Sequence, residues 1–450
     1  MNEGPNSNTQ TETFTITETI TDTVTVTKST GAIAEVEQYW ETLGPGLTTG
    51  ASDDDPSGIA TYSQAGATYG FSLLWMSLFT FPLMAVVQEM CARIGLATGQ
   101  GLAANIRTHY PKKILYTATF LLLIANIFNI GADLGAMAKG VQLVLPNASF
   151  ALLVILFGVG GLLLQVFINY KTYAKYLKYL ALVLFSYVAT ALFVHMDWVL
   201  VLKNTVVPHI NFSKDQIFLI CGILGTTISP YLFFWQTSQE VEEEILSPDP
   251  TLPRKHNLSD TEVKKMRTDV WSGMFISNVV MFFIIATTGA TLFSQGITIT
   301  TAADAAQALR PLAGNFAFIL FAIGILGTGM LAIPVLAGSS AYAVSESMGW
   351  KFGLYRKLKE AYAFYGVIAL ATVVGIVLNF VGIDPIKALI YSAVLNGIIA
   401  PIVLYFIVKL SSNPEVMGNR ANSKLVKFIG WLTIVLMGLT AVSVVVSFFL

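Results

Sequence analysis

Charged residues are scarce in this chain of 450 residues, of which only 12% are charged while 54% are hydrophobic. An average soluble chain carries about twice that share of charge, so the composition excludes an ordinary soluble protein. Cysteine is nearly absent, since only Cys91 and Cys221 occur and both fall inside apolar runs. Two such residues build neither a disulfide framework nor a metal cluster. The composition therefore predicts an all-α integral membrane protein.

Long apolar runs are what the chain has in abundance. A run of about 20 residues is long enough to cross a bilayer as a helix. About eleven spans of this kind are predicted. They cover residues 44–70, 71–93, 113–143, 149–169, 176–200, 215–241, 268–294, 312–340, 361–382, 386–409 and 426–449.

Lysine and arginine are concentrated in alternate loops between these spans. If the N-terminus is cytoplasmic, the loops assigned to the outside hold only Lys203, Lys214, Arg310 and Lys387. The loops assigned to the inside hold the larger share, in groups around residues 93–113, 171–178, 254–267, 351–359 and 409–427. The positive-inside rule then predicts a cytoplasmic N-terminus, and an odd number of spans puts the C-terminus outside.

The chain divides into a tail, two halves and one additional helix. Residues 1–33 are rich in threonine and glutamate, cannot bury a core and are expected to be disordered. Spans one to five, within residues 34–211, and spans six to ten, within residues 212–411, start in opposite orientations. This is the condition for two inverted repeats. Residues 412–450 then add an eleventh span outside the repeats.

Two proline breaks interrupt apolar spans at matching places in the two halves. The first is Asp53-Asp54-Asp55-Pro56-Ser57-Gly58, and the second is Thr226-Thr227-Ile228-Ser229-Pro230-Tyr231. A proline removes a backbone donor and frees carbonyl groups in the turn before it. Broken helices at corresponding positions of inverted repeats are typical of secondary transporters, whose ion sites lie there.

The available ligands at the two breaks are oxygen atoms. Three aspartates at the C-terminal end of a helix repel each other and oppose its dipole, and a bound cation would offset this. The alternative is a solvated, aspartate-rich turn near the surface. At the second break, Ser229 and the Thr226 carbonyl are the better ligand candidates, while Thr227 is expected to bond back to its own helix. Oxygen ligands favour hard cations such as Mg²⁺, Ca²⁺ or Mn²⁺.

Several other polar residues lie inside the predicted spans. Asn278 and Asn396 could line the site or serve as hydrogen-bonding contacts between helices. Glu89 lies four residues before Arg93, a spacing that favours a structural salt bridge. Asp133 is expected to find a partner on another helix, since Lys139 is poorly placed for it.

Several short strings stand out along the chain: LGPG at residues 43–46, DPSGIAT at 55–61, QAGA at 64–67, Gln88 with ARIGLATG at 92–99, ADL at 132–134, RTD at 267–269 and SNVVMFFII at 277–285. Together they resemble the NRAMP divalent-metal transporters. The resemblance covers nearly all of the chain after residue 40. It implies a LeuT-type fold with five plus five inverted helices, of which the first and sixth are broken.

The departures from the family pattern concern the metal site and the proton route. The family site reads Asp-Pro-Gly-Asn and Met-Pro-His, whereas this chain has Gly58, Ser229 and Tyr231 in place of the asparagine, methionine and histidine. Without the soft thioether, the preference for transition metals should relax. Ala136 stands where the family carries a glutamate, so proton coupling is not expected. The pattern resembles the bacterial NRAMP-related magnesium transporters.

The resemblance implies a transporter, not an enzyme, that imports Mg²⁺ and also Mn²⁺ across a bacterial inner membrane. Asp55 would supply the charge, with Asp54 beside it. The other site residues implied are Ser57, Gly58, Thr226 and Ser229, which would shape the site, and Tyr231, Asn278 and Asn396, which would line it. We expect the cation and the lipid bilayer as partners, no cofactor, no nucleic acid and no obligatory protein partner.

Two other functions are compatible with parts of this pattern. A proton-coupled importer of Mn²⁺ or Fe²⁺ would need another titratable residue, such as Asp133 or Asp54, to replace the missing route. A metal sensor that binds without transporting would normally carry a soluble output domain, which the tail and short loops do not provide. An enzyme is the least favoured, because no nucleophile and base pair accompanies the aspartates.

Overall fold

The computed structural model describes residues 44–168, 182–246 and 258–449, and every regular element in these ranges is a helix. The threonine-rich tail, the start of the fifth predicted span and part of the loop after the sixth lie outside the described residues. The α-helices are α2 (Pro45–Asp53), α3 (Pro56–Tyr69), α4 (Trp75–Thr98), α5 (Leu102–His109), α6 (Lys112–Val144), α7 (Phe150–Phe167), α9 (Phe185–Phe193), α10 (Trp198–Val206), α11 (Lys214–Thr227), α12 (Pro230–Ile245), α13 (Asp260–Thr291), α14 (Ala302–Ala306), α15 (Arg310–Ala313), α16 (Ala317–Met348), α17 (Tyr362–Leu378), α18 (Pro385–Ser411), α19 (Pro414–Met417) and α20 (Lys424–Ser447). Short 3₁₀ turns are η1 (Leu182–Leu184), η2 (Phe293–Gln295), η3 (Gln307–Leu309), η4 (Gly314–Phe316), η5 (Leu358–Glu360) and η6 (Gly418–Arg420).

Most helices match the predicted spans, but the fifth span, predicted for residues 176–200, is interrupted. Helix α9 ends at Phe193 and a separate helix, α10, begins at Trp198, where the Asp197 side chain caps its first turn. Within the described residues, eight helical segments are long and apolar enough to cross a membrane, and Leu182–Phe193 and Tyr362–Leu378 are shorter apolar helices. The first predicted span is divided between α2 and α3, which contain 9 and 14 residues. The prediction of an all-α membrane protein is thus confirmed.

Both predicted proline breaks are present. Helix α2 ends at Asp53 and α3 begins at Pro56, while α11 ends at Thr227 and α12 begins at Pro230. In each case proline occupies the first turn of the following helix, where its missing N–H costs nothing because that donor has no helical partner. The aspartate or serine before it has an extended backbone, which the following proline ring favours.

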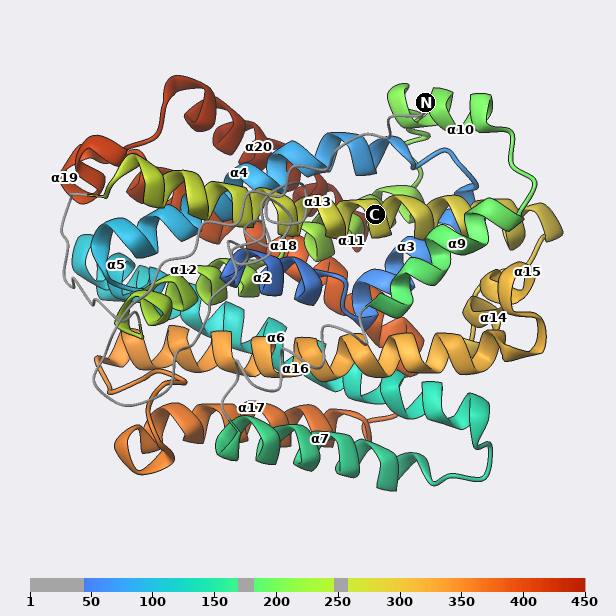
Figure 1. Cartoon of the computed structure of the whole chain (residues 1–450), viewed down its shortest axis with the longest axis horizontal. Coiled ribbons are helices and arrows are strands. Elements are labelled where there is room, and N and C mark those ends of the chain that lie inside the picture. The colour runs from blue at the N-terminus through green and yellow to red at the C-terminus, as the bar shows by residue number, and fades with distance from the viewer. Residues whose placement is uncertain (1–43, 169–181, 247–257, 450) are drawn as a thin grey trace, which may run out of the picture. The chain divides into compact units, whose positions relative to one another are not determined.

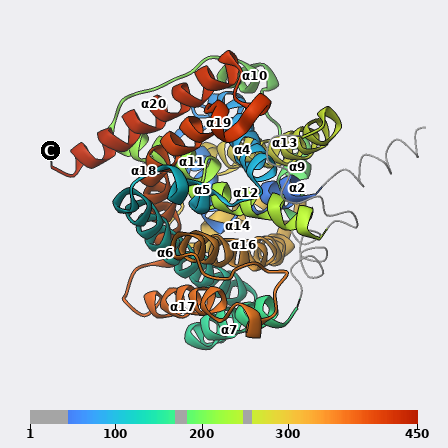
Figure 2. The same ribbon diagram turned by 90° about the vertical axis from the view of Figure 1, so that its left-hand side faces the viewer.

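The unbroken helices surround the two broken ones. Helix α16 runs beside α6, and α17 and α7 lie side by side beyond them, as both views show (Figure 1, Figure 2). Helix α18 packs against α11 on one side and α6 on another, and α13 packs against both α2 and α3. Four long helices, α6, α13, α16 and α18, therefore position the breaks.

Helix α2 is fixed closely to α13. The Asp269 carboxylate accepts hydrogen bonds from the backbone N–H of Gly46, at 2.6 Å, and of Leu47, at 3.0 Å. These are the first N–H groups of α2, which have no partner within the helix, so Asp269 caps it from outside. A Cβ atom at Gly46 would lie only 2.6 Å from the Val270 backbone nitrogen. Glycine is therefore required at this crossing.

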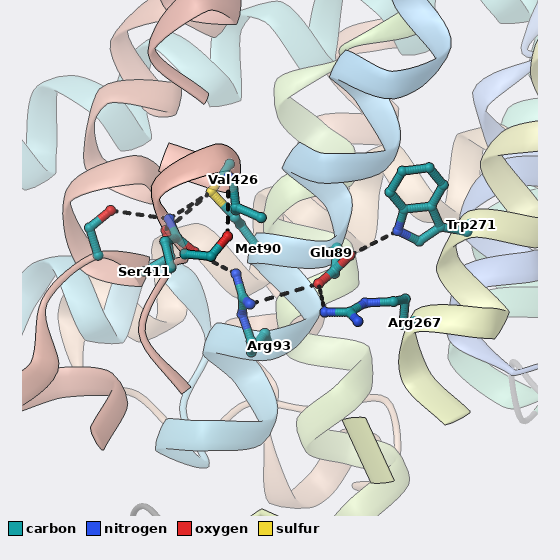
Figure 3. Close-up of polar contacts among 10 residues, drawn as sticks. Glu89, Met90, Arg93, Arg267, Trp271, Ser411 and Val426 are labelled. Carbon is teal, nitrogen blue, oxygen red and sulfur yellow. Dashed lines mark hydrogen bonds and ion pairs between the residues drawn. The ribbon is translucent and has the colours of Figure 1, made fainter. Parts of the chain in front are cut away.

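A second polar contact joins α4 to α13 and to the chain after α18 (Figure 3). The Glu89 carboxylate lies 3.7 Å from Arg93 and 2.8 Å from Arg267, and it accepts a hydrogen bond of 2.8 Å from the Trp271 indole. Arg93 also donates to the side-chain carbonyl of Asn422. The structural salt bridge predicted for Glu89 is confirmed, and it is part of a larger network.

We predict that Glu89→Gln destabilises the protein without removing a cation ligand. The side chains of Glu89 and Arg93 are only 4% and 7% exposed, so the change leaves a buried guanidinium without its carboxylate. Breaking a buried pair costs about 3–5 kcal/mol, and we expect the lower end because Arg267 is half exposed. The thermal midpoint in detergent should fall clearly. Asp260→Asn, which breaks the exposed ion pair with Arg420, is the control and should change it far less.

Candidate functional site

The two breaks lie against each other in the interior. A Cβ atom at Gly58 would lie 3.1 Å from the Thr226 hydroxyl oxygen and 3.4 Å from the Asp53 carbonyl oxygen. The Tyr231 hydroxyl donates a 3.0 Å hydrogen bond to the carbonyl of Ser52. The structure thus brings residues of the first and sixth predicted spans to one place, as the sequence analysis expected.

Asp55 is the carboxylate at the centre of this region and is only 1% exposed. Its Oδ1 accepts hydrogen bonds from the Ser57 hydroxyl, at 2.6 Å, and from the Gly58 backbone N–H, at 2.8 Å. Its Oδ2 accepts a 2.9 Å hydrogen bond from the side-chain amide of Asn129 on α6. Three donors therefore hold this carboxylate in one orientation.

The electrostatic expectation for the three aspartates holds for two of them and is wrong for the third. Helix α2 ends at Asp53, so Asp53 and Asp54 lie at the C-terminal end of a helix as expected, but Asp55 is the N-cap of α3 and lies at that helix's N-terminus. Asp followed by proline at the first helical position favours this arrangement. A negative charge there is stabilised by the helix dipole, so a bound cation is not needed to offset repulsion at Asp55.

The other two aspartates turn towards α13. The Ser277 hydroxyl lies 2.7 Å from Asp53 Oδ2 and 3.3 Å from Asp54 Oδ1. All three carboxylates are buried, but no group of three Asp, Glu, His or Cys side chains that could hold a metal occurs in the described parts of the chain. A site here has few carboxylate ligands and depends on neutral oxygens.

The hydroxyl groups of the second break have different environments. Thr227 donates to the carbonyl of Ile223, at 2.5 Å, as expected. Ser229, the N-cap of α12, bonds back to the preceding helix α11, because its hydroxyl lies 2.7 Å from the Thr226 carbonyl and 2.9 Å from that of Gly225. The hydroxyl of Thr226 is buried and has no hydrogen-bond partner among the described residues. Thr226 is therefore the hydroxyl that is open to a ligand.

The space beside Gly58 is small. Glycine stands here in place of the family's asparagine, which by itself would leave a wider site, but the Thr226 hydroxyl of the second break lies 3.1 Å from where a Cβ atom would be. The neighbouring helix therefore fills part of the volume that the smaller residue leaves.

The two asparagines with alternative readings differ in their surroundings. Asn278 donates to the Thr80 hydroxyl at 3.3 Å, with the Met84 sulfur at 3.6 Å, so its amide serves a contact between α13 and α4. Asn396 on α18 is 1% exposed, and neither amide atom has a partner in the described chain. An amide that is buried and unpaired in this way can accept a ligand or a water.

Asp133 does not find the partner expected on another helix. Both of its carboxylate oxygens are buried without a hydrogen bond from any described residue. Two further buried oxygens close to Asp55 also have no partner among the described residues. One is Oδ1 of Asp53, two residues before Asp55, and the other is Oδ1 of Asn129, whose amide nitrogen contacts Asp55. Buried polar groups normally have partners, so water or a hydrated ion can occupy this region.

Two residues of this region carry no role in the sequence analysis, namely Asn129 and Ser277. Both reach the aspartates across long separations in the chain, of 74 residues for Asn129 and 224 for Ser277. For Asn129 its polarity inside an apolar span was the available signal, and Ser277 also begins the string at residues 277–285 that resembles the family. Polar residues in such spans are functional candidates, but nothing local tells which helix they face.

Two interrupted helices that meet in the interior, surrounded by long unbroken helices, define a transporter of the secondary type. The profile of the Nramp family, described as "Natural resistance-associated macrophage protein-like", matches residues 46–447. The chain therefore belongs to the Nramp family, and it is a multi-pass membrane transporter, not an enzyme.

Known proteins with similar sequence or structure agree with this assignment. The chain is 28% identical over 396 residues to the "Divalent metal cation transporter MntH" of Klebsiella pneumoniae subsp. pneumoniae, covering 86% of this chain and 90% of the relative. The manganese transporter of Eremococcus coleocola, solved with an aromatic bis-isothiourea compound, superposes with a TM-score of 0.70 at 18% identity, covering 93% of this chain and 88% of that one.

A more distant likeness concerns the fold alone. Mhp1, a nucleobase-cation-symport-1 family transporter, superposes with a TM-score of 0.54 at 15% identity, covering 90% of this chain and 91% of its own. The predicted LeuT-type fold is confirmed.

Proposed function

We propose that this chain imports divalent cations, Mg²⁺ and also Mn²⁺, into the cytoplasm of a bacterium by alternating access. The family supports divalent metal as the substrate class, since relatives are named as divalent metal and manganese transporters. We also propose that the protein lies in the inner membrane with its N-terminus in the cytoplasm. Residues 34–211 and 212–411 would form its two inverted repeats.

The choice of Mg²⁺ rests on the chemistry around Asp55. The groups in contact with its carboxylate are a hydroxyl, a backbone N–H and an amide, and the facing residue of the second break is Thr226. Mg²⁺ takes oxygen ligands, dehydrates reluctantly and usually keeps several waters. The buried acceptors of Thr226, Asn129 and Asp53 that have no partner among the described residues suit the waters of such an ion.

The second break supports the same choice. Ser229 and Tyr231 carry hydroxyl groups where the family pattern has methionine and histidine. The thioether and imidazole of those residues favour transition metals, whereas hydroxyl groups do not. A thioether does approach this break, but the Met281 sulfur lies 4.0 Å from Thr227, whose hydroxyl is bonded back to its own helix.

Uptake of a divalent ion has a sufficient driving force without protons. An inside-negative potential of about 100 mV contributes about 4.6 kcal/mol for two charges, from about 2.3 for each. Tyrosine and alanine, which stand at Tyr231 and Ala136, do not exchange protons near pH 7. We therefore propose that transport is not coupled to protons.

A proton-coupled importer of Mn²⁺ or Fe²⁺ is the second candidate. One observation favours it, because the Asp133 carboxylate is buried and has no hydrogen-bond partner in the described parts of the chain. Such a group could carry a proton in place of the residues that the chain lacks.

We predict that proteoliposomes take up Mg²⁺ without acidification of the interior. A Mg²⁺ gradient at a negative potential set by K⁺ and valinomycin should raise the signal of an internal Mg²⁺ dye, while a pH dye matches protein-free vesicles. Acidification that increases with Mg²⁺ dose would contradict the uncoupled mechanism, and Asp133→Asn would then show whether Asp133 carries the proton. Uptake of Mn²⁺ but not Mg²⁺ would contradict the proposed substrate.

A further inference from the structure

Asn129 lies at the point where α6 meets the first break. Its side chain is completely buried, and its Nδ2 donates to Asp55 Oδ2 at 2.9 Å. The other oxygen of Asp55 is held by Ser57 and Gly58, which belong to the same helix as Asp55. Asn129 is therefore the contact that ties the carboxylate to a different helix.

The backbone around Asn129 is fixed on both sides. One turn earlier, Asn126 donates to the hydroxyl groups of Ser339, at 2.7 Å, and Ser340, at 2.9 Å, both on α16. Two residues later, the Gly131 carbonyl accepts a 2.8 Å hydrogen bond from the Asn379 side chain. The amide of Asn129 is thus presented to Asp55 from a rigid position.

The other end of the Asn129 amide is an open acceptor. Its Oδ1 is buried and no described residue donates to it. Because the nitrogen faces the carboxylate, the oxygen is left for a donor that the protein does not supply. A cation that keeps its waters brings such donors, whereas a cation that loses its waters does not.

We propose that Asn129 is a positioning residue of the cation site that favours a hydrated ion. Its Nδ2 orients Asp55, and its Oδ1 accepts a hydrogen bond from a water bound to the cation. This inference rests on the proposed role of Asp55, and it adds a third helix, α6, to the two broken helices that the sequence pointed to.

The test compares Asn129→Ala with Asn126→Ala, which changes the same residue type one turn away. Both asparagines are buried and hydrogen-bonded, but Asn126 contacts α16 and not Asp55. Asn129→Leu keeps the branching and the number of side-chain heavy atoms and so guards against a cavity effect. Uptake of Mg²⁺ and of Mn²⁺ into proteoliposomes gives KM and maximal rate for each, and calorimetry in detergent gives the Kd for Mn²⁺.

We expect both Asn129 variants to raise the KM for Mg²⁺ at least tenfold, and that for Mn²⁺ by a smaller factor, with the maximal rate largely kept. Asn126→Ala should leave both KM values within about twofold, even if its thermal midpoint falls, because it breaks a contact between helices only. Equal changes in the Asn126 and Asn129 variants, or an unchanged KM in Asn129→Leu, would overturn the inference.

The Mn²⁺ measurements separate this inference from the proposed function. If the unmodified protein carries Mn²⁺ but not Mg²⁺, the proposed substrate is wrong, while the Mn²⁺ Kd still shows whether Asn129 supports the site. If Asp55→Asn abolishes Mn²⁺ binding and Asn129→Leu does not weaken it, the proposed site stands and the role of Asn129 fails.

Discussion

Asp55→Asn should abolish uptake of divalent cations while the protein stays folded. Asparagine is as good an N-cap as aspartate, so its side-chain oxygen can still accept the hydrogen bond from the Gly58 backbone. The change removes the charge, which we place directly against the ion, and it also replaces the oxygen that accepts from Asn129 by an amide nitrogen. Uptake in proteoliposomes should fall to the level of empty vesicles, with a thermal midpoint close to that of the unmodified protein.

The neighbouring aspartates provide the comparison. Asp54→Asn and Asp53→Asn remove a charge from the same break, but these two carboxylates face Ser277 and not Asn129. We expect reduced but measurable uptake in both. Equal and complete loss in all three variants, at normal expression, would mean that the ion's charge is shared among them and that the assignment to Asp55 is too narrow.

Ser229→Met should shift selectivity from Mg²⁺ towards Mn²⁺ and Cd²⁺. The thioether adds a soft ligand, which favours these ions, and the loss of the hydroxyl releases the carbonyl groups of Gly225 and Thr226. Competition of Cd²⁺ against Mg²⁺ uptake is the measurement. We expect Cd²⁺ to compete at least tenfold better than in the unmodified protein.

Ser229→Leu is the matched control, because leucine has a similar volume and releases the same carbonyl groups but has no sulfur. An equal shift in the leucine variant would show that shape, and not sulfur, sets the selectivity.

Adding Gly58→Asn to Ser229→Met should lower Mg²⁺ uptake further, but the new Cβ must displace the Thr226 hydroxyl by a few tenths of an ångström. Unchanged Mg²⁺ uptake in the double variant would place ion choice elsewhere.

The helical breaks were predictable because their cause is local. Asp55-Pro56 and Ser229-Pro230 each combine a residue that caps helices with one that cannot continue them, and the helices begin at these prolines. Apolar runs of membrane length likewise needed no tertiary information. For these features, the order of residues along a few turns contains the physical reason.

The details of the site depend on which helices contact each other, and the local sequence pattern does not contain this information. Asn129 and Asn278 look alike in sequence, since each is an amide within an apolar run. In the structure one donates to Asp55 and the other to Thr80. The hydroxyl of Ser229 bonds back to carbonyl groups of the preceding helix, α11, whereas that of Thr226, in the last turn of α11, has no partner among the described residues.

The close crossing of α2 and α13 limits how a path to the site can open at this end of α2. Two hydrogen bonds to a carboxylate join the start of α2 to Asp269, and the glycine at Gly46 allows the backbones to touch. Charge-assisted bonds of this kind are about twice as strong as neutral ones. A tilt of α2 alone would break both and leave its first amides without acceptors in an apolar setting. Opening on this side must therefore move α2 and α13 together as one unit, or begin with the release of the α2 amides by Asp269.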